Sequence, residues 1–161
     1  MKVTVLKKLI VKNILSAVAV AIFGFILLNL AFLFDFFVHY LAIELVKLFT
    51  GVNPLIAYKW FPPTMHLMFV VIIGLISWLI FRSKLRVLFK AIYMTVPLAV
   101  VFATLGIFLY RWPIAAYLIG SLLSVGILYY FYRTKQPWIY YYTLILISLT
   151  MLFVGLSGVE I

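Results

Sequence analysis

The stretch LIVKNILSAVAVAIFGFILLNLAFL, residues 9–33, decides the fold of this chain because it is apolar over almost its whole length. At about 1.5 Å of rise per residue, a helix of this length exceeds the hydrocarbon core of a bilayer, which is about 30 Å thick. Four more apolar runs of sufficient length follow: 64–81, 87–110, 113–132 and 138–156. The sequence therefore predicts an all-α integral membrane helical bundle with five transmembrane helices.

The composition agrees with a membrane protein and excludes a water-soluble one. Of the 161 residues, 68% are hydrophobic and only 10% are charged, which leaves too few polar groups to cover a surface in water. No connection between the apolar runs is long enough for a soluble domain, so we expect residues 1–161 to form a single polytopic membrane domain. The chain has no cysteine, which excludes disulfides and thiolate metal ligands.

Cationic residues are concentrated at three of the places where the predicted spans meet the membrane surface. The formal net charge is +10, and in a membrane protein such an excess marks the cytoplasmic side. Ten of the thirteen cations fall at the start of the first span, around the connection between the second and third spans, and in the connection between the fourth and fifth: Lys2, Lys7, Lys8, Lys12, Arg82, Lys84, Arg86, Lys90, Arg133 and Lys135. The other side would hold Lys47, Lys59, Arg111 and the three acids, Asp35, Glu44 and Glu160. This alternation predicts the N-terminus inside and the C-terminus outside, in a bacterial or archaeal cytoplasmic membrane.

The segment FRSKLRVLFK, residues 81–90, is the densest of these cationic regions. Anionic lipid heads are its expected partners, at Arg82, Lys84, Arg86 and Lys90. The same four residues also serve as topology determinants. Nucleic acid is not an expected partner, because membrane orientation accounts for the positive charge.

The segment between the first two spans has the periodicity of a helix. One stripe of it is apolar: Phe37, Leu41, Leu45 and Leu48. This pattern predicts a short interfacial helix over residues 36–49 in the first outer loop, with the stripe toward the lipid. It fits equally well a continuous extension of the first span beyond the lipid. Gly51 and Pro54 then predict the end of the helix.

No charged side chain lies near the centre of a predicted span. Proton pumps, cation exchangers and voltage sensors need buried ionisable groups, so these classes are not expected. Pairs of small residues at a spacing of four favour close helix packing instead. These pairs are Ala17 with Ala21, Ala99 with Ala103, and Gly120 with Ser124. Pro97 predicts a bend in the third span.

Four titratable residues are expected on the outer side of the membrane: Asp35, His39, Glu44 and His66. Histidine with carboxylate is the smallest set that could bind a metal or act as acid and base. Catalytic zinc usually takes three protein ligands, however, and no HExxH motif occurs, so we predict no metal site and no cofactor. Asp35 and His39 share a helix face, and their mutual pairing or contact with water is the simpler interpretation.

The sequence KWFPP, residues 59–63, lies just before the second span. Trp60 suits the headgroup layer, while Pro62 and Pro63 suit a first helical turn, where the missing donors would be unpaired anyway. Together with the five spans, this loop resembles the tryptophan-rich sensory and translocator family, which binds porphyrins and sterols in a five-helix bundle. The resemblance implies that Trp60, Pro62 and Pro63 belong to a lid over a ligand cavity. The chain departs from that family in having only four tryptophans.

These observations favour two classes of function and leave a third open. Short loops, uncharged spans and faces of small residues favour a non-enzymatic subunit or accessory partner of a membrane complex or transporter, bound to another protein or to copies of itself. The bent third span and the aromatic residues favour a carrier or receptor for a hydrophobic small molecule or lipid, with residues 51–63 as its lid. The third hypothesis is an intramembrane enzyme that uses Asp35, His39 and His66.

Overall fold

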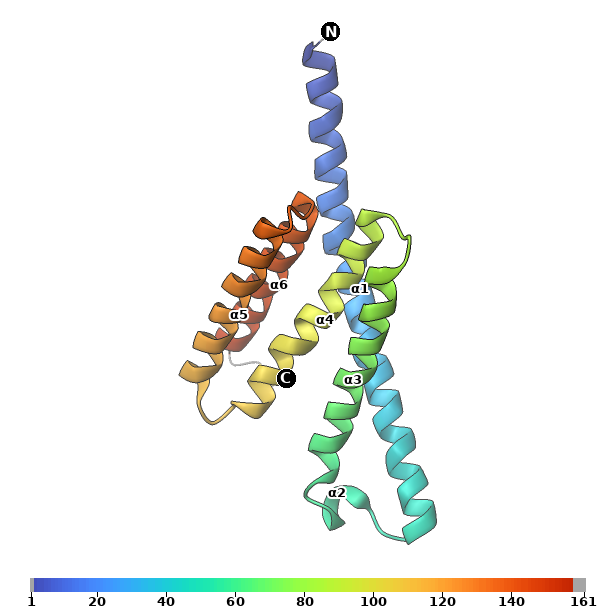
Figure 1. Ribbon diagram of the computed structural model, residues 1–161. Coiled ribbons are helices and arrows are strands. Elements are labelled where there is room, and N and C mark those ends of the chain that lie inside the picture. Colours follow the sequence, from blue (N-terminus) through green and yellow to red (C-terminus); the bar gives the residue numbers. More distant parts are fainter. Residues whose placement is uncertain (1, 158–161) are drawn as a thin grey trace.

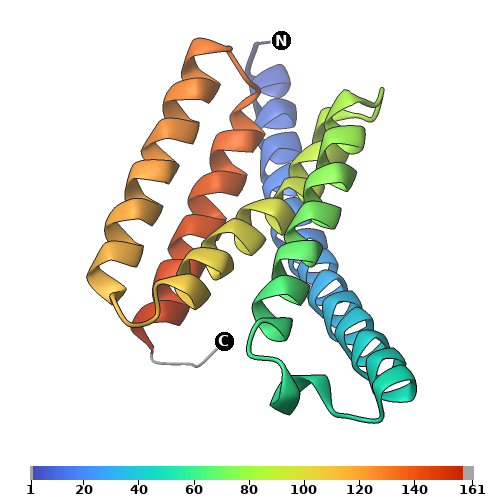
Figure 2. The same ribbon diagram turned by 60° about the horizontal axis from the view of Figure 1, so that its bottom comes forward.

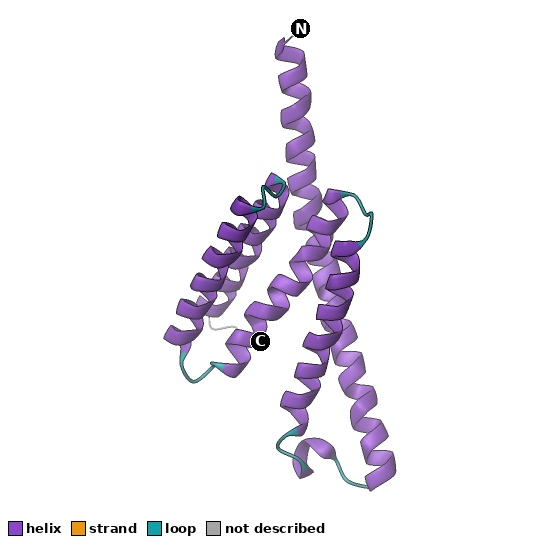
Figure 3. Ribbon diagram, viewed as in Figure 1, coloured by secondary structure: helices purple, strands orange, loops and turns teal. Residues whose placement is uncertain are grey.

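The computed structural model describes residues 2–157, and this part of the chain is almost entirely helical (Figures 1 and 3). Its helices are α1 Lys2–Thr50, α2 Pro54–Ala57, α3 Phe61–Arg82, α4 Val87–Phe108, α5 Pro113–Arg133 and α6 Trp138–Leu156. All except α2 are long enough and apolar enough to cross a membrane. The predicted class is therefore confirmed: the protein is an integral, polytopic membrane protein built from helices.

From α3 onward, the helices agree with the predicted spans to within a few residues. Prolines mark two of the starts, because Pro62 and Pro63 lie in the first turn of α3 and Pro113 begins α5. Proline is tolerated there since the backbone donor that it lacks has no partner within the helix. Local sequence alone is therefore enough to place these boundaries.

The first helix is longer than the predicted first span. α1 continues without a break through Thr50, so residues 36–49 are its C-terminal part and not a separate interfacial helix. No glycine or proline interrupts the chain between Gly24 and Gly51. Gly51 ends the helix with a φ of +69°, a left-handed conformation that glycine adopts without strain. The short helix of this connection is α2, whose N-cap Asn53 accepts a hydrogen bond from the Leu55 backbone N–H.

α4 lies at the centre of the bundle, in contact with α1, α3, α5 and α6 (Figure 2). Its buried residues are Ala91, Met94, Thr95, Val96, Leu98, Ala99, Val100 and Ala103. Part of this set packs with Val20 of α1 and Leu144 of α6, and another part packs with Phe69 and Ile73 of α3. The other long helices are therefore held together mainly through α4.

The closest approach between α1 and α4 occurs at Gly24. A Cβ atom added there would lie 2.5 Å from Cγ2 of Thr95, which is closer than real contacts allow. The Thr95 hydroxyl lies 2.7 Å from the Ile92 carbonyl on its own helix and 3.2 Å from the Gly24 carbonyl on α1. Gly24 thus allows two helix backbones to meet and gives the buried threonine an interhelical acceptor.

The connections fall at two ends of the molecule (Figure 1). The N-terminal part of α1, the α3–α4 connection and the α5–α6 connection lie at one end, which we call the basic end. The α1–α3 and α4–α5 connections lie at the opposite end. The ten cations predicted to be inside therefore belong to the basic end. Which end faces the cytoplasm stays a prediction from charge, and Glu160 lies outside the described residues.

Substitution of Gly24 by alanine should weaken the α1–α4 contact, because the new methyl group would overlap Cγ2 of Thr95. We expect a loss of about 1–3 kcal/mol in the free energy of unfolding, measured by denaturant titration in detergent micelles. Gly74→Ala is the matched control, since nothing lies within 4 Å of a Cβ atom there. Adding Thr95→Ser, which removes Cγ2, should restore much of the loss. Equal effects of Gly24→Ala and Gly74→Ala would contradict this account of the contact.

Candidate functional site

The first polar pair in the helices is formed by Asp35 and His39, one turn apart on α1. The His39 Nδ1 atom lies 3.1 Å from the Asp35 carboxylate Oδ1 and 3.0 Å from the Asp35 backbone carbonyl. The carbonyl takes the hydrogen bond, whereas Oδ1 is buried and has no hydrogen-bond partner among the described residues. An unsatisfied buried acceptor is costly, and the near donor to this one is His39 Nδ1 itself, whose side chain and that of Asp35 are 26% and 21% exposed.

The second histidine joins two helices. Nε2 of His66, in the second turn of α3, lies 3.0 Å from the hydroxyl oxygen of Thr104 on α4. That hydroxyl also lies 2.6 Å from the Val100 carbonyl, to which it donates its only proton. Nε2 must therefore carry the proton and donate it to Thr104. The Phe108 ring lies 6.1 Å from the imidazole, centroid to centroid, and completes its surroundings on α4.

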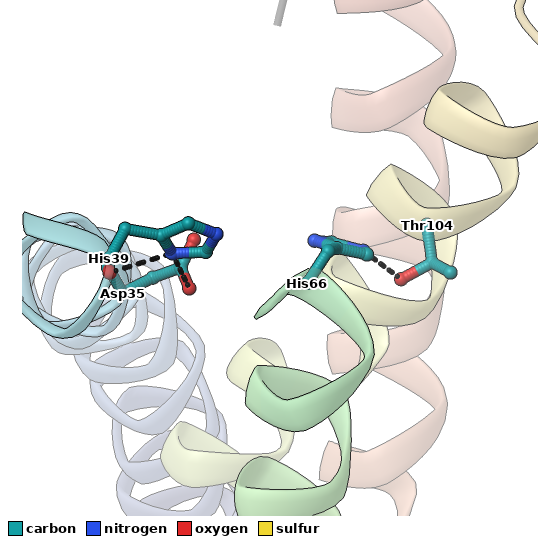
Figure 4. Close-up of polar contacts among 4 residues, drawn as sticks. All are labelled: Asp35, His39, His66 and Thr104. Carbon is teal, nitrogen blue, oxygen red and sulfur yellow. Dashed lines mark hydrogen bonds and ion pairs between the residues drawn. The ribbon is translucent and has the colours of Figure 1, made fainter. Parts of the chain in front are cut away.

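In Figure 4 the His39 ring extends from α1 toward α3, whereas the His66 ring is bonded to Thr104 on its side away from His39. These helices both pack against α4 and make little direct contact with each other. Glu44 does not join the two histidines, because its ion-pair partner in the described chain is Lys47, 3.8 Å away. No set of three histidine or carboxylate side chains that could hold a metal converges within the described residues. The arrangement offers one proton donor or acceptor on each side, and His66 already uses one nitrogen for Thr104.

The residues of the predicted lid lie at the start of α3. Trp60 is the N-cap residue, and it packs against the rings of Tyr58 and Phe61 at centroid distances of 5.7 and 6.2 Å. Phe61 is buried, whereas Trp60, Pro62 and Pro63 are exposed. The geometry accounts for these residues as the start of a helix, and their role as a lid stays a prediction.

A cavity of about 450 Å³ lies between α4, α5 and α6, near the opposite end, and the sequence analysis did not locate it. Its walls are mostly apolar, and its polar groups come from Tyr117, Ser121, Ser124 and Ser148. The Ser124 and Ser148 hydroxyls are 3.1 Å apart, and Ser124 also donates to the Gly120 carbonyl at 2.9 Å. Residues 51–63 contribute nothing to the lining.

The small residues that leave room for this cavity were visible in the sequence, but they were interpreted as helix-packing residues. Gly120 and Ser124 were taken as a helix-packing pair, and they do bring α5 close to its neighbours, since the Phe102 ring lies 3.7 Å from a Cβ atom added at Gly120. Small side chains also leave space, and three glycines line the cavity: Gly106, Gly120 and Gly155. Whether a small residue closes a contact or opens a cavity depends on the opposing helix, which the local pattern does not contain.

The cations of the α3–α4 connection have mixed surroundings. Nζ of Lys90 donates a hydrogen bond of 2.8 Å to the Phe81 carbonyl near the end of α3. The Arg82 guanidinium lies 5.0 Å from the ring centroid of Trp78. Lys84 and Arg86 are exposed. Two of the four residues expected to attract lipid heads therefore already contact their own chain, and their binding to lipid stays a prediction.

Comparison with protein families, with curated proteins and with solved structures finds no match for this chain. The fold and the geometry together define the class: a polytopic helical membrane protein whose described part contains two histidine sites and a cavity between three helices.

A double-mutant cycle with His66→Ala and Thr104→Val should measure the hydrogen bond between α3 and α4. We expect a coupling free energy of about 0.6 kcal/mol, the usual size for such bonds within membranes, from unfolding in detergent micelles. Thr104→Ser keeps the hydroxyl and should retain most of the coupling with His66. A coupling free energy near zero in the cycle of His66→Ala with Thr104→Val would contradict the hydrogen bond.

Proposed function

We propose that the protein is a non-enzymatic subunit or accessory partner of a membrane complex. The observation that carries this proposal is the length of α1, which has 49 residues. Such a helix is about 74 Å long, and even at a tilt of about 40° it covers about 56 Å along the membrane normal, against a hydrocarbon core of about 30 Å. A large part of α1 therefore extends beyond the hydrocarbon core.

The two projecting parts of α1 differ in character. At the basic end, lysines alternate with apolar residues, which suits the headgroup layer. At the opposite end, where α1 and α3 continue past the α4–α5 connection (Figure 1), the side chains are mainly apolar and exposed. Leu48 and Phe49 are 79% and 82% exposed, and Phe36 is 69% exposed. Covering such side chains stabilises a complex by about 1.5–3 kcal/mol each, so this surface is suited to a protein partner.

The Asp35–His39 pair adds specificity to this surface. Both side chains of the pair are partly exposed, at 26% and 21%, so a partner that supplies a donor can bond the carboxylate from its exposed side. Apolar area supports association in general, whereas one correctly placed donor distinguishes one partner from another. The enzyme hypothesis gains no such support, because His66 uses Nε2 for Thr104 and His39 uses Nδ1 for a carbonyl.

Photo-crosslinking from α1 would test the proposal, with a benzophenone amino acid replacing Phe37 or Phe49 in membranes from cells that express the protein. Because both residues are exposed on the C-terminal part of α1, we expect crosslinks to a protein, either a different chain or a second copy. Leu122 on α5 and Phe153 on α6 are control positions with 71% and 73% exposure, and they should give adducts with lipid only. Lipid adducts alone at all four positions would count against the proposal.

The cavity supports a second candidate function, a carrier or receptor for a hydrophobic small molecule or lipid. Its volume of about 450 Å³ is within the range of ligand pockets, about 300–1,000 Å³, and pockets of this kind combine apolar walls with a few polar groups. The hydroxyls of Ser121 and Tyr117 are such groups. In this form of the hypothesis, the ligand lies between α4, α5 and α6 rather than beneath residues 51–63.

Filling the cavity should displace such a ligand without unfolding the protein. Gly106 lines the cavity, and a Cβ atom there meets nothing within 4 Å, so Gly106→Leu can enter the open space without a clash. We expect native mass spectrometry to show less retained small molecule or lipid for this variant than for wild type. Gly126→Leu is the control, since Gly126 is equally open but lies outside the cavity lining. Equal retention in both variants would remove the support for this function.

A further inference from the structure

A groove of about 620 Å³ lies at the basic end, where the N-terminal part of α1 passes the start of α4. Three cationic side chains border it: Lys7, Lys8 and Lys12. The groove is shallow and open: apart from Leu88 of α4, its other lining residues are Val11, Leu15, Ser16 and Ala19 of α1. Lysines and alkyl side chains therefore line one continuous groove.

The three lysines have no counter-charge within the described chain. No hydrogen bond or ion pair joins their side chains to a described residue, and the described carboxylates, Asp35 and Glu44, lie in the other half of α1. The basic end as a whole collects ten cations and no acid. Neutralisation of this charge must come from an anion outside the described residues.

The dimensions of the groove indicate what kind of anion fits. From Lys8 to Ala19, α1 rises by about 16 Å, which is close to the thickness of one leaflet of a hydrocarbon core of about 30 Å. With the lysines at the headgroup level, Leu15 and Ala19 lie at the depth of acyl chains. A free phosphate ion would use only the lysines, whereas a phospholipid would use both parts of the groove.

We propose that this groove binds one anionic phospholipid, with its phosphate between Lys7, Lys8 and Lys12 and an acyl chain along α1 and α4. The site is separate from the α3–α4 connection, where Lys90 is bonded to the Phe81 carbonyl. It is also separate from the partner surface, which lies in the other half of α1. The lipid anchors the projecting part of α1 at the membrane surface, where the helix has left the contacts of the bundle.

The test compares lipid retention after extraction from vesicles that contain equal amounts of phosphatidylglycerol and phosphatidylcholine with the same chains. Native mass spectrometry should show that the wild-type protein retains phosphatidylglycerol preferentially. A variant with Lys7, Lys8 and Lys12 replaced by glutamine should lose this preference. Its affinity for phosphatidylglycerol should fall about fivefold for each lysine removed. The matched control replaces Arg133 and Lys135 by glutamine and is compared with a Lys7→Gln/Lys8→Gln variant, because it removes two charges from the same end but none from the groove or from the α3–α4 connection.

Two further measurements separate a lipid from a phosphate ion and from general charge attraction. Leu15→Gln changes the apolar wall at an exposed position, and it should weaken retention of long-chain phosphatidylglycerol while leaving competition by a short-chain analogue unchanged. Inorganic phosphate at millimolar concentration should not displace the long-chain lipid. Displacement by phosphate, or equal losses in the groove variant and the control variant, would overturn the proposal. Lys8→Gln alone serves as a second variant if the triple substitution gives an aggregated protein.

Discussion

The contact between α1 and α4 at Gly24 and Thr95 is the constraint on which the rest of the bundle depends. α4 holds the other long helices together, and its approach to α1 is limited by a threonine that fits only against a glycine. Hydrophobic association cannot determine the arrangement of helices within lipid, because the acyl chains are as apolar as the side chains. Close packing and a few interhelical hydrogen bonds therefore determine how the helices are arranged, and both are present at this contact.

The sequence predicts what is local and misses what depends on a neighbouring helix. The spans follow from apolar runs bounded by residues such as Pro113, and the nearness of Asp35 to His39 follows from their spacing on one helix. Residues 36–49 fitted either a separate interfacial helix or an extension of the first span, and the structure has the extension; an amphipathic stripe carries no information on whether the helix breaks before it. The partner of His66 could not be predicted, since Thr104 is 38 residues away in the chain.

Polar side chains within the spans are used mainly to join helices. Ser124 and Ser148 link α5 to α6, and Ser77 lies 3.2 Å from the Tyr93 hydroxyl between α3 and α4. Ser124 and Ser77 also bond a carbonyl of their own helix, Gly120 and Ile73 respectively, so for these two hydroxyls the interhelical contact adds to a hydrogen bond that is already made. The buried Asp35 Oδ1 atom is different, because its one near donor, His39 Nδ1 at 3.1 Å, gives its hydrogen bond to the Asp35 carbonyl instead.

The continuity of α1 has a mechanical consequence. From Phe25 to Thr50 the helix contains no glycine or proline, and at Gly24 it packs directly against Thr95. Because α1 is continuous from this contact to Thr50, a tilt of the segment after Gly24 would be carried to Leu48 and Phe49 at the opposite end of the bundle.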